Sequence, residues 1–167
     1  MTRRLGIRSD FEPRVRAIDW SKYETAYGSA CGSDRPDLGW GSVGDQLVRL
    51  ASRNLDEASE AQHQLWCGLC HQHVTVSSAA LPALPFLLEV LDAGPDEITR
   101  DVLDICLGFA TGGVYPADWV YEPWHHTLRD QLQRELPRFH ALTTHTDPSI
   151  VEFATEIVAA LVSRKSA

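Results

Sequence analysis

Helical periodicity of the apolar residues is the feature that most limits what this chain can fold into. From residue 43 onward, apolar side chains recur at intervals of three and four residues, and no convincing run alternates between apolar and polar positions. One clear stripe comprises Ile98, Val102, Ile105 and Phe109. A period near 3.6 places such residues on one face of an α-helix, whereas a strand requires a period of two. The sequence therefore predicts an all-α fold.

Proline, glycine and acidic residues place the first helix boundaries. A short helix over 43–51 is followed by a longer one over about 55–72. The next helix is expected to begin close to Leu81, because Pro82 and Pro85 are tolerated in a first turn, where a missing backbone N–H costs nothing.

Three further helices complete the expected set. One has Pro95 at its first helical position and stops at Gly112. Another spans 128–142 and is expected to bend or break near Pro137. The last one is expected to be capped by Asp147, whose side chain can accept hydrogen bonds from free N–H groups of the first turn.

The second helices of successive pairs begin near residues 56, 95 and 147, which are separations of roughly 40 and 50 residues. Repeats of paired helices have this length. We therefore predict one domain over 1–167, a short right-handed α-solenoid of about three helical hairpins. Residues 15–30, "VRAIDWSKYETAYGSA", are expected to form an N-terminal capping helix, and residues 1–16 a flexible N-terminus.

Three segments carry a resemblance to a known family: "IDWSKYETAYGSA", "LWCGLCHQHVTVSSAALPALPFLLEVL" and "DPSIVEFATEIVAAL". They resemble successive segments of the HEAT-repeat-containing proteins common in actinobacteria, over most of 17–110 and more loosely over 128–163. The resemblance implies a HEAT-like α-solenoid, a fold used chiefly as a binding scaffold. The chain departs from the family pattern at Cys67, Cys70, His73 and Val151, where small or apolar residues, glycine and an arginine are usual.

Acidic residues are concentrated in the middle of the chain. The net charge is −8, and the stretch from Asp34 to Glu122 holds 14 acidic and 4 basic residues. Because nucleic acid is bound through Lys and Arg, this balance disfavours nucleic acid and favours a basic protein partner. Simple solubility is the alternative explanation of the charge.

No stretch of the sequence resembles a secretory signal or a membrane span, because charged residues interrupt every apolar run before about 18 residues. We expect a cytoplasmic protein that does not bind membranes, with all four cysteines as thiols.

The motif "LWCGLCHQH" contains Cys67-x-x-Cys70-His71, with His63 and His73 nearby. It can indicate c-type haem attachment, a zinc site completed by a second segment, or a redox-active dithiol. Both sulfurs, however, fall in the apolar stripe of the expected helix, where cysteine acts as a small hydrophobic residue. We therefore expect no cofactor and no metal here. His71 and Gln72 are expected to hold the turn that ends the helix.

The segment "TGGVYPADWVYEPWHH" is expected to form an insertion loop over 111–124 in the last repeat. Loops rich in Trp and Tyr often carry binding hot spots. Tyr121, with Trp124, could instead join the core at helical spacing from Leu128. The predicted partner-binding residues come from two places. The insertion contributes aromatic and acidic side chains, and the helix that begins at Pro95 contributes an acidic face. The residues are Glu97, Asp101, Asp104, Tyr115, Asp118, Trp119, Tyr121 and Glu122.

No catalytic or nucleotide-binding motif is found, so the favoured function is a non-enzymatic binding module, a monomer or weak oligomer. By analogy with bacterial immunity proteins of similar size, the best hypothesis is an inhibitor that binds and neutralises a cognate toxin with a basic surface. One alternative is a zinc- or redox-sensing regulator that uses Cys67, Cys70 and His71. Another is a HEAT-like DNA glycosylase, which the acidic charge disfavours.

Overall fold

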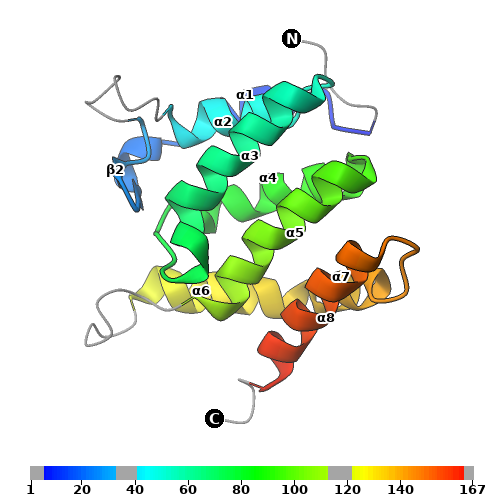
Figure 1. The fold of residues 1–167 in the computed structure, drawn as a ribbon. Coiled ribbons are helices and arrows are strands. Elements are labelled where there is room, and N and C mark those ends of the chain that lie inside the picture. The colour runs from blue at the N-terminus through cyan, green and yellow to red at the C-terminus, as the bar shows by residue number, and fades with distance from the viewer. Residues whose placement is uncertain (1–5, 33–40, 113–121, 164–167) are drawn as a thin grey trace.

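Eight α-helices dominate the part of the chain that the computed structural model describes, residues 6–32, 41–112 and 122–163 (Figure 1). The helices are α1 (Phe11–Arg16), α2 (Val43–Leu50), α3 (Leu55–Cys70), α4 (Ala80–Ala93), α5 (Asp96–Thr111), α6 (Pro123–Arg134), α7 (Leu136–Leu142) and α8 (Pro148–Ser163). The expected all-α class is confirmed. Across these three ranges, no helix has the length and apolar composition that a bilayer-crossing segment requires.

Neighbouring helices pack in pairs, and the pairs lie side by side. Helix α2 packs on α3, α4 on α5, and α7 on α8. The second helix of each pair also packs on the next one, α3 on α5 and α5 on α8, and Figure 1 shows these three running in the same general direction. Helix α5 therefore lies between neighbours on several sides, and the four residues of its predicted stripe are all fully or almost fully buried.

Side chains cap the helices where the sequence places polar residues. Asp147 Oδ1 accepts hydrogen bonds from the N–H groups of Ser149 at 2.8 Å and Ile150 at 3.3 Å, as predicted. Ser42 and Asn54 cap α2 and α3 in the same way. Such caps satisfy N–H groups that have no partner within the helix.

The predicted boundaries near proline are partly right. The break expected near Pro137 is confirmed, since α6 ends at Arg134 and α7 begins at Leu136. Helix α4 begins at Ala80, one residue before the predicted start, which confirms that boundary. The placement of Pro85 in the first turn was wrong, because Pro85 is the sixth residue of the helix. At that position its ring removes the N–H that would bond the carbonyl of Leu81. Because Pro85 is exposed, the missing hydrogen bond lies on the outer side of the helix and not in the core.

The capping helix expected over 15–30 is wrong. Helix α1 ends at Arg16, and a short 3₁₀ turn over Trp20–Lys22 leads into an antiparallel ribbon of β1 (Glu24–Thr25) and β2 (Gly28–Ser29). Gly28 closes the ribbon with a φ of +113°, a conformation that L residues rarely adopt and that no helix contains.

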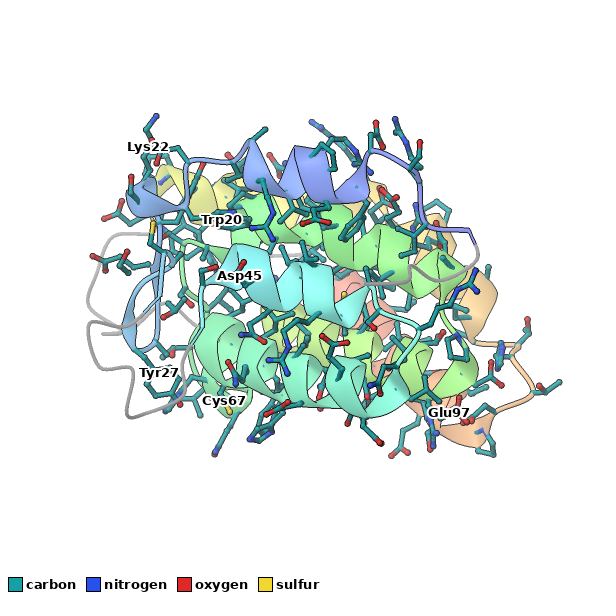
Figure 2. All side chains as sticks on the ribbon, turned by 90° about the horizontal axis from the view of Figure 1, so that it is seen from above. Trp20, Lys22, Tyr27, Asp45, Cys67 and Glu97 are labelled. Atoms are coloured by element: carbon teal, nitrogen blue, oxygen red, sulfur yellow. The ribbon has the colours of Figure 1, made fainter. Side chains whose placement is uncertain are left out.

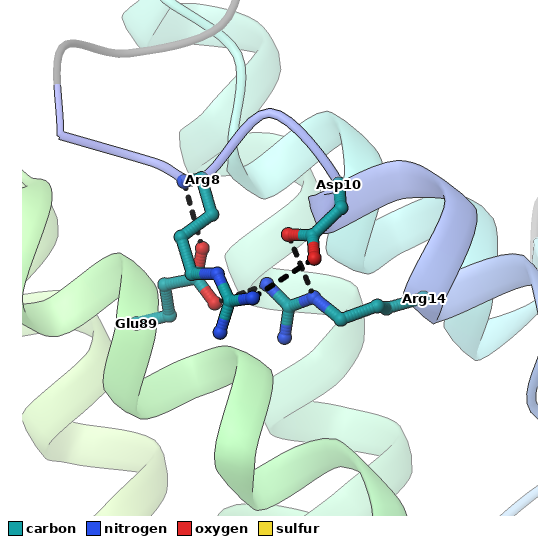
Figure 3. A network of polar contacts seen from close by, with 4 residues as sticks. All are labelled: Arg8, Asp10, Arg14 and Glu89. Carbon is teal, nitrogen blue, oxygen red and sulfur yellow. Dashed lines mark hydrogen bonds and ion pairs between the residues drawn. The ribbon is translucent and has the colours of Figure 1, made fainter.

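The N-terminal segment, expected to be flexible over 1–16, is packed onto the rest of the protein from residue 6, where the described part begins. Phe11 and Val15 of α1 are buried in the core. A polar network joins α1 to α4 (Figure 3): Arg14 Nη2 lies 2.5 Å from Glu89 Oε2, and the backbone N–H of Arg8 donates to Glu89 Oε1 at 2.9 Å. Asp10 completes it by pairing with both arginines. Helix α1 is therefore a structural part of the domain.

Candidate functional site: a groove beside a left-handed turn

The turn after α3 is the most unusual backbone segment that the structure describes. Three consecutive residues that are not glycine have positive φ: His71 at 34°, Gln72 at 56° and His73 at 66°. Each such residue costs on the order of 1–3 kcal/mol and persists only where its surroundings hold it. Strain of this kind is often found at functional sites.

His73 fastens the turn to α5. Its Nε2 atom lies 2.8 Å from Asp104 Oδ1 and 3.0 Å from the Asp104 carbonyl oxygen. Because both are acceptors, Nε2 carries the ring proton and donates it. A protonated Nε2 cannot also accept a hydrogen bond from the indole N–H of Trp66, although Trp66 Nε1 lies only 3.3 Å from it.

The carbonyl groups at the end of α3 are satisfied from two other segments. Ser77 Oγ donates to the carbonyl of Gly68 at 2.6 Å and to that of Leu69 at 3.1 Å. The backbone N–H of Ala26 donates to Gly68 as well, at 2.8 Å. The turn is located where His71 and Gln72 predicted it, but the hydrogen bonds expected from these two residues are made by Ser77 and Ala26.

His71 instead contacts the β1–β2 ribbon. Its Nδ1 atom lies 3.5 Å from the Tyr27 hydroxyl, and the two rings meet edge to face with centroids 6.0 Å apart. The Tyr27 hydroxyl also contacts the thiol of Cys67, and burial raises the pKa of both groups. Tyr27 thus connects the ribbon, the turn and α3.

A groove of about 760 Å³ lies between this turn, the ribbon and the start of α6. Its walls come from three separate segments of the chain, and its lining residues are Lys22, Glu24, Thr25, Ala26, His71, Val74, Thr75, Val76, Ser77, Ser78, Glu122 and Trp124. Volumes of roughly 300–1,000 Å³ are typical of ligand-binding clefts. Figure 2 shows Lys22 and Tyr27 at the same end of the molecule as Cys67.

The charge of the groove is set by two carboxylates. Glu24 and Glu122 are exposed, and within the described ranges neither side chain has a basic partner. The lining holds one lysine, Lys22, which is paired with Asp19 at 3.4 Å, and one histidine, His71. The groove is therefore acidic, and a cation is the complementary ligand.

Apolar surface is exposed in the same groove. Val74 is 62% exposed, which is unusual for a large aliphatic side chain. Trp124 is half-buried in the first turn of α6 and packs edge to face on the fully buried His125, with centroids 5.5 Å apart. It both joins the core and lines the groove, so the two alternatives weighed for the end of the insertion coexist at this residue.

The cysteines of "LWCGLCHQH" lie in the core as expected. Cys67, Cys70 and Cys106 are buried and only Cys31 is exposed, and all four are free thiols. Burial raises the pKa of Cys70 and Cys67, and that of Cys106 to about 12. Among the described residues, no three His, Cys, Asp or Glu side chains gather closely enough to hold a metal ion.

These thiols should therefore react very unequally. We expect a thiol reagent such as Ellman's reagent to modify Cys31 rapidly in the folded protein, because the thiolate is the reactive form and the other three are buried and protonated. All four should react in urea, and Cys31→Ser should remove the fast phase. Rapid reaction of Cys67 or Cys70 in the Cys31→Ser protein would contradict the structural role of these residues.

The predicted acidic face of α5 divides into two parts. Glu97 is exposed and lies at the opposite end of the molecule from Tyr27 and Cys67 in Figure 2. Asp104 is bonded to His73, and Asp101 is half-buried with its carbonyl accepting from Gln62 Nε2 at 3.2 Å. Reversal of Asp104 would disturb the turn, so Glu97 is the clean probe of this face.

The structure brings only part of the predicted site together. Glu122 and His71 share the groove, whereas Glu97 is remote from it. Tyr115, Asp118, Trp119 and Tyr121 lie outside the described residues. Sequence reasoning missed Glu24 and Val74 as groove residues, and it left Trp124 open between the insertion surface and the core. Neither Glu24 nor Val74 carries a local sequence signal that separates it from other acidic or apolar residues.

No protein-family model, no curated protein and no solved structure matches this chain.

Proposed function

We propose that this protein is a non-enzymatic binding module that engages a basic partner protein through the groove and neutralises it, as immunity proteins neutralise cognate toxins. The observation that carries the proposal is the acidic groove, in which Glu24 and Glu122 have no basic partner within the described ranges. A carboxylate without a partner gains more from a bound cation than one already paired.

A short HEAT-like α-solenoid of three hairpins, right-handed and related to the actinobacterial HEAT-repeat proteins, is the architecture we propose for it. Support comes from the packing of α2 with α3, α4 with α5 and α7 with α8, and from the side-by-side order of the second helices. Such stacks present extended surfaces and serve mainly as scaffolds for binding.

A cationic toxin, such as a nuclease that binds phosphate through basic residues, is the partner class that fits an acidic inhibitor. Opposite charges speed the encounter of the two proteins, and the effect weakens as salt increases. The net charge of −8 supports this electrostatic contribution, and the groove supplies a specific place of contact.

Charge reversal in the groove tests the proposal. The wild-type protein, immobilised and exposed to lysate of the native host at low salt, should retain a stoichiometric companion with a basic surface, which is then purified. Glu24→Lys combined with Glu122→Lys should weaken binding of that companion about 30-fold, because attraction is replaced by repulsion. The purified companion should also lose its own activity when the wild-type protein is added.

A matched control is available on α8. Glu152 and Glu156 are exposed and lie outside the groove lining. Their double replacement by lysine changes the net charge by the same amount and should alter affinity only by the general salt-dependent contribution, roughly 3-fold or less. Absence of any stoichiometric companion, or equal loss of affinity in both double variants, would overturn the proposal. If only Glu97→Lys lost affinity, the binding surface would lie on α5 and not in the groove.

A further inference from the structure

We infer that the groove binds an arginine side chain of the basic partner, with the guanidinium against the Trp124 indole and between the carboxylates of Glu24 and Glu122. This inference rests on the proposed function and specifies the residue by which the partner is recognised. Three features of the groove support it: a fixed aromatic ring, two carboxylates on fixed backbone, and neighbouring serines that already make hydrogen bonds. The planar shape and the N–H donors of a guanidinium fit these features.

Trp124 is held in place before any ligand arrives. It follows Pro123 in the first turn of α6, packs against the core, and contacts the fully buried His125 edge to face at 5.5 Å. A ring that is already fixed loses little side-chain entropy on binding. Tryptophan is also the aromatic residue that attracts cations most strongly.

Both carboxylates are mounted on backbone that is fixed by hydrogen bonds. The N–H of Glu24 donates to Ser78 Oγ at 2.9 Å, and its carbonyl accepts from the N–H of Ala79 at 3.0 Å. Glu122 occupies the N-cap position of α6, yet its side chain makes no cap hydrogen bond. Among the residues that the structure describes, no donor occupies either side chain, so both can act as acceptors in the groove.

Two other polar side chains of the groove lining already make hydrogen bonds. Ser77 Oγ donates to two carbonyl groups at the end of α3, and Ser78 Oγ accepts from Glu24. The two carboxylates are acceptors only, so they suit a cation that brings several N–H donors.

Arginine satisfies this arrangement better than lysine. Its guanidinium is planar, presents five N–H donors in a fixed fork, and stacks on an aromatic face while it pairs with carboxylates. The ammonium of lysine is a compact, strongly hydrated charge that cannot stack in this way. Glu24 should contribute more than Glu122, because the positive end of the α6 dipole offsets part of the Glu122 charge.

Titration of the ¹⁵N-labelled protein with N-acetyl-arginine amide tests the inference. The indole N–H signal of Trp124, assigned with Trp124→Phe, should shift and saturate. N-acetyl-lysine amide should bind at least about 5-fold more weakly, and the citrulline analogue, which has the same shape without the charge, should not shift the signal. Glu24→Gln should weaken arginine binding more than Glu122→Gln, and Glu152→Gln should leave it unchanged.

Equal binding of citrulline and arginine, equal binding of lysine and arginine, or no saturable shift would each overturn the inference. Loss of arginine binding in Glu152→Gln as large as in Glu24→Gln would do so too. The proposed function is tested separately. It stands, even if free arginine does not bind, when the companion is retained and the double variant Glu24→Lys with Glu122→Lys weakens its binding. It falls if arginine binds the groove but the wild-type protein retains no companion.

Discussion

Gly108→Ala is expected to lower the free energy of unfolding by about 3 kcal/mol, because α5 packs against the end of α3 at this residue without space for a methyl group. A Cβ atom at Gly108 would lie 2.6 Å from both Cβ and Sγ of Cys70 and 2.9 Å from Cδ2 of His73. Cys70 is buried and His73 is held by Asp104, so neither can move aside cheaply. The gain of about 1 kcal/mol in helix propensity does not offset this overlap.

Gly68→Ala is the matched control, because it makes the same substitution near the end of the neighbouring helix. Here the added Cβ would lie 3.6 Å from Thr25, an ordinary contact distance. The higher helix propensity of alanine should therefore raise the free energy of unfolding by up to about 1 kcal/mol. Thermal unfolding measures both: Gly108→Ala should lower the Tm by roughly 6–12 °C, whereas Gly68→Ala should keep or raise it. Equal effects of the two would contradict the close approach of α3 and α5 at Cys70.

The helices could be predicted from the sequence because their causes are local. A cap such as Asp147, a glycine such as Gly112 and an apolar period near 3.6 act within one or two turns, and they placed both ends of α5 and the start of α8 to within a residue or so. The N-terminal ribbon could not be predicted in this way. Its β1 and β2 strands have two residues each, and the ribbon is held by contacts with distant segments, such as the bonds of Ala26 to Gly68 and Glu24 to Ala79.

The groove was hidden for a related reason. Its walls come from residues 22–26, 71–78 and 122–124, which become neighbours only after the helices pack. In the sequence, Glu24 is one of 23 acidic residues, and nothing local marks it as a groove residue. Glu122 was predicted from its place in the aromatic insertion, but Asp104, predicted alongside it, has a structural role. The charge count correctly indicated an acidic protein, but only the pairing of each carboxylate distinguishes available acceptors from occupied ones.

Ile157→Ala is expected to lower the free energy of unfolding by about 2–5 kcal/mol, since Ile157 is fully buried and its loss leaves a cavity that the surroundings fill only in part. Val162→Ala on the same helix is the control: Val162 is 52% exposed, so its truncation should change stability by no more than about 0.5 kcal/mol. Urea unfolding followed by tryptophan fluorescence and by circular dichroism measures both.

The shape of the Ile157→Ala transition is as informative as its midpoint. Because α8 packs on both α5 and α7, damage at Ile157 should reach the central helix, and the two signals should still change together in one transition. In a stack whose units are only loosely coupled, α7 and α8 would instead unfold first, and circular dichroism would fall before the fluorescence of Trp20 and Trp66. A separate early phase would mean that the last helix pair is not part of the unit that holds the groove. An unchanged midpoint would contradict the burial of Ile157 against its neighbours.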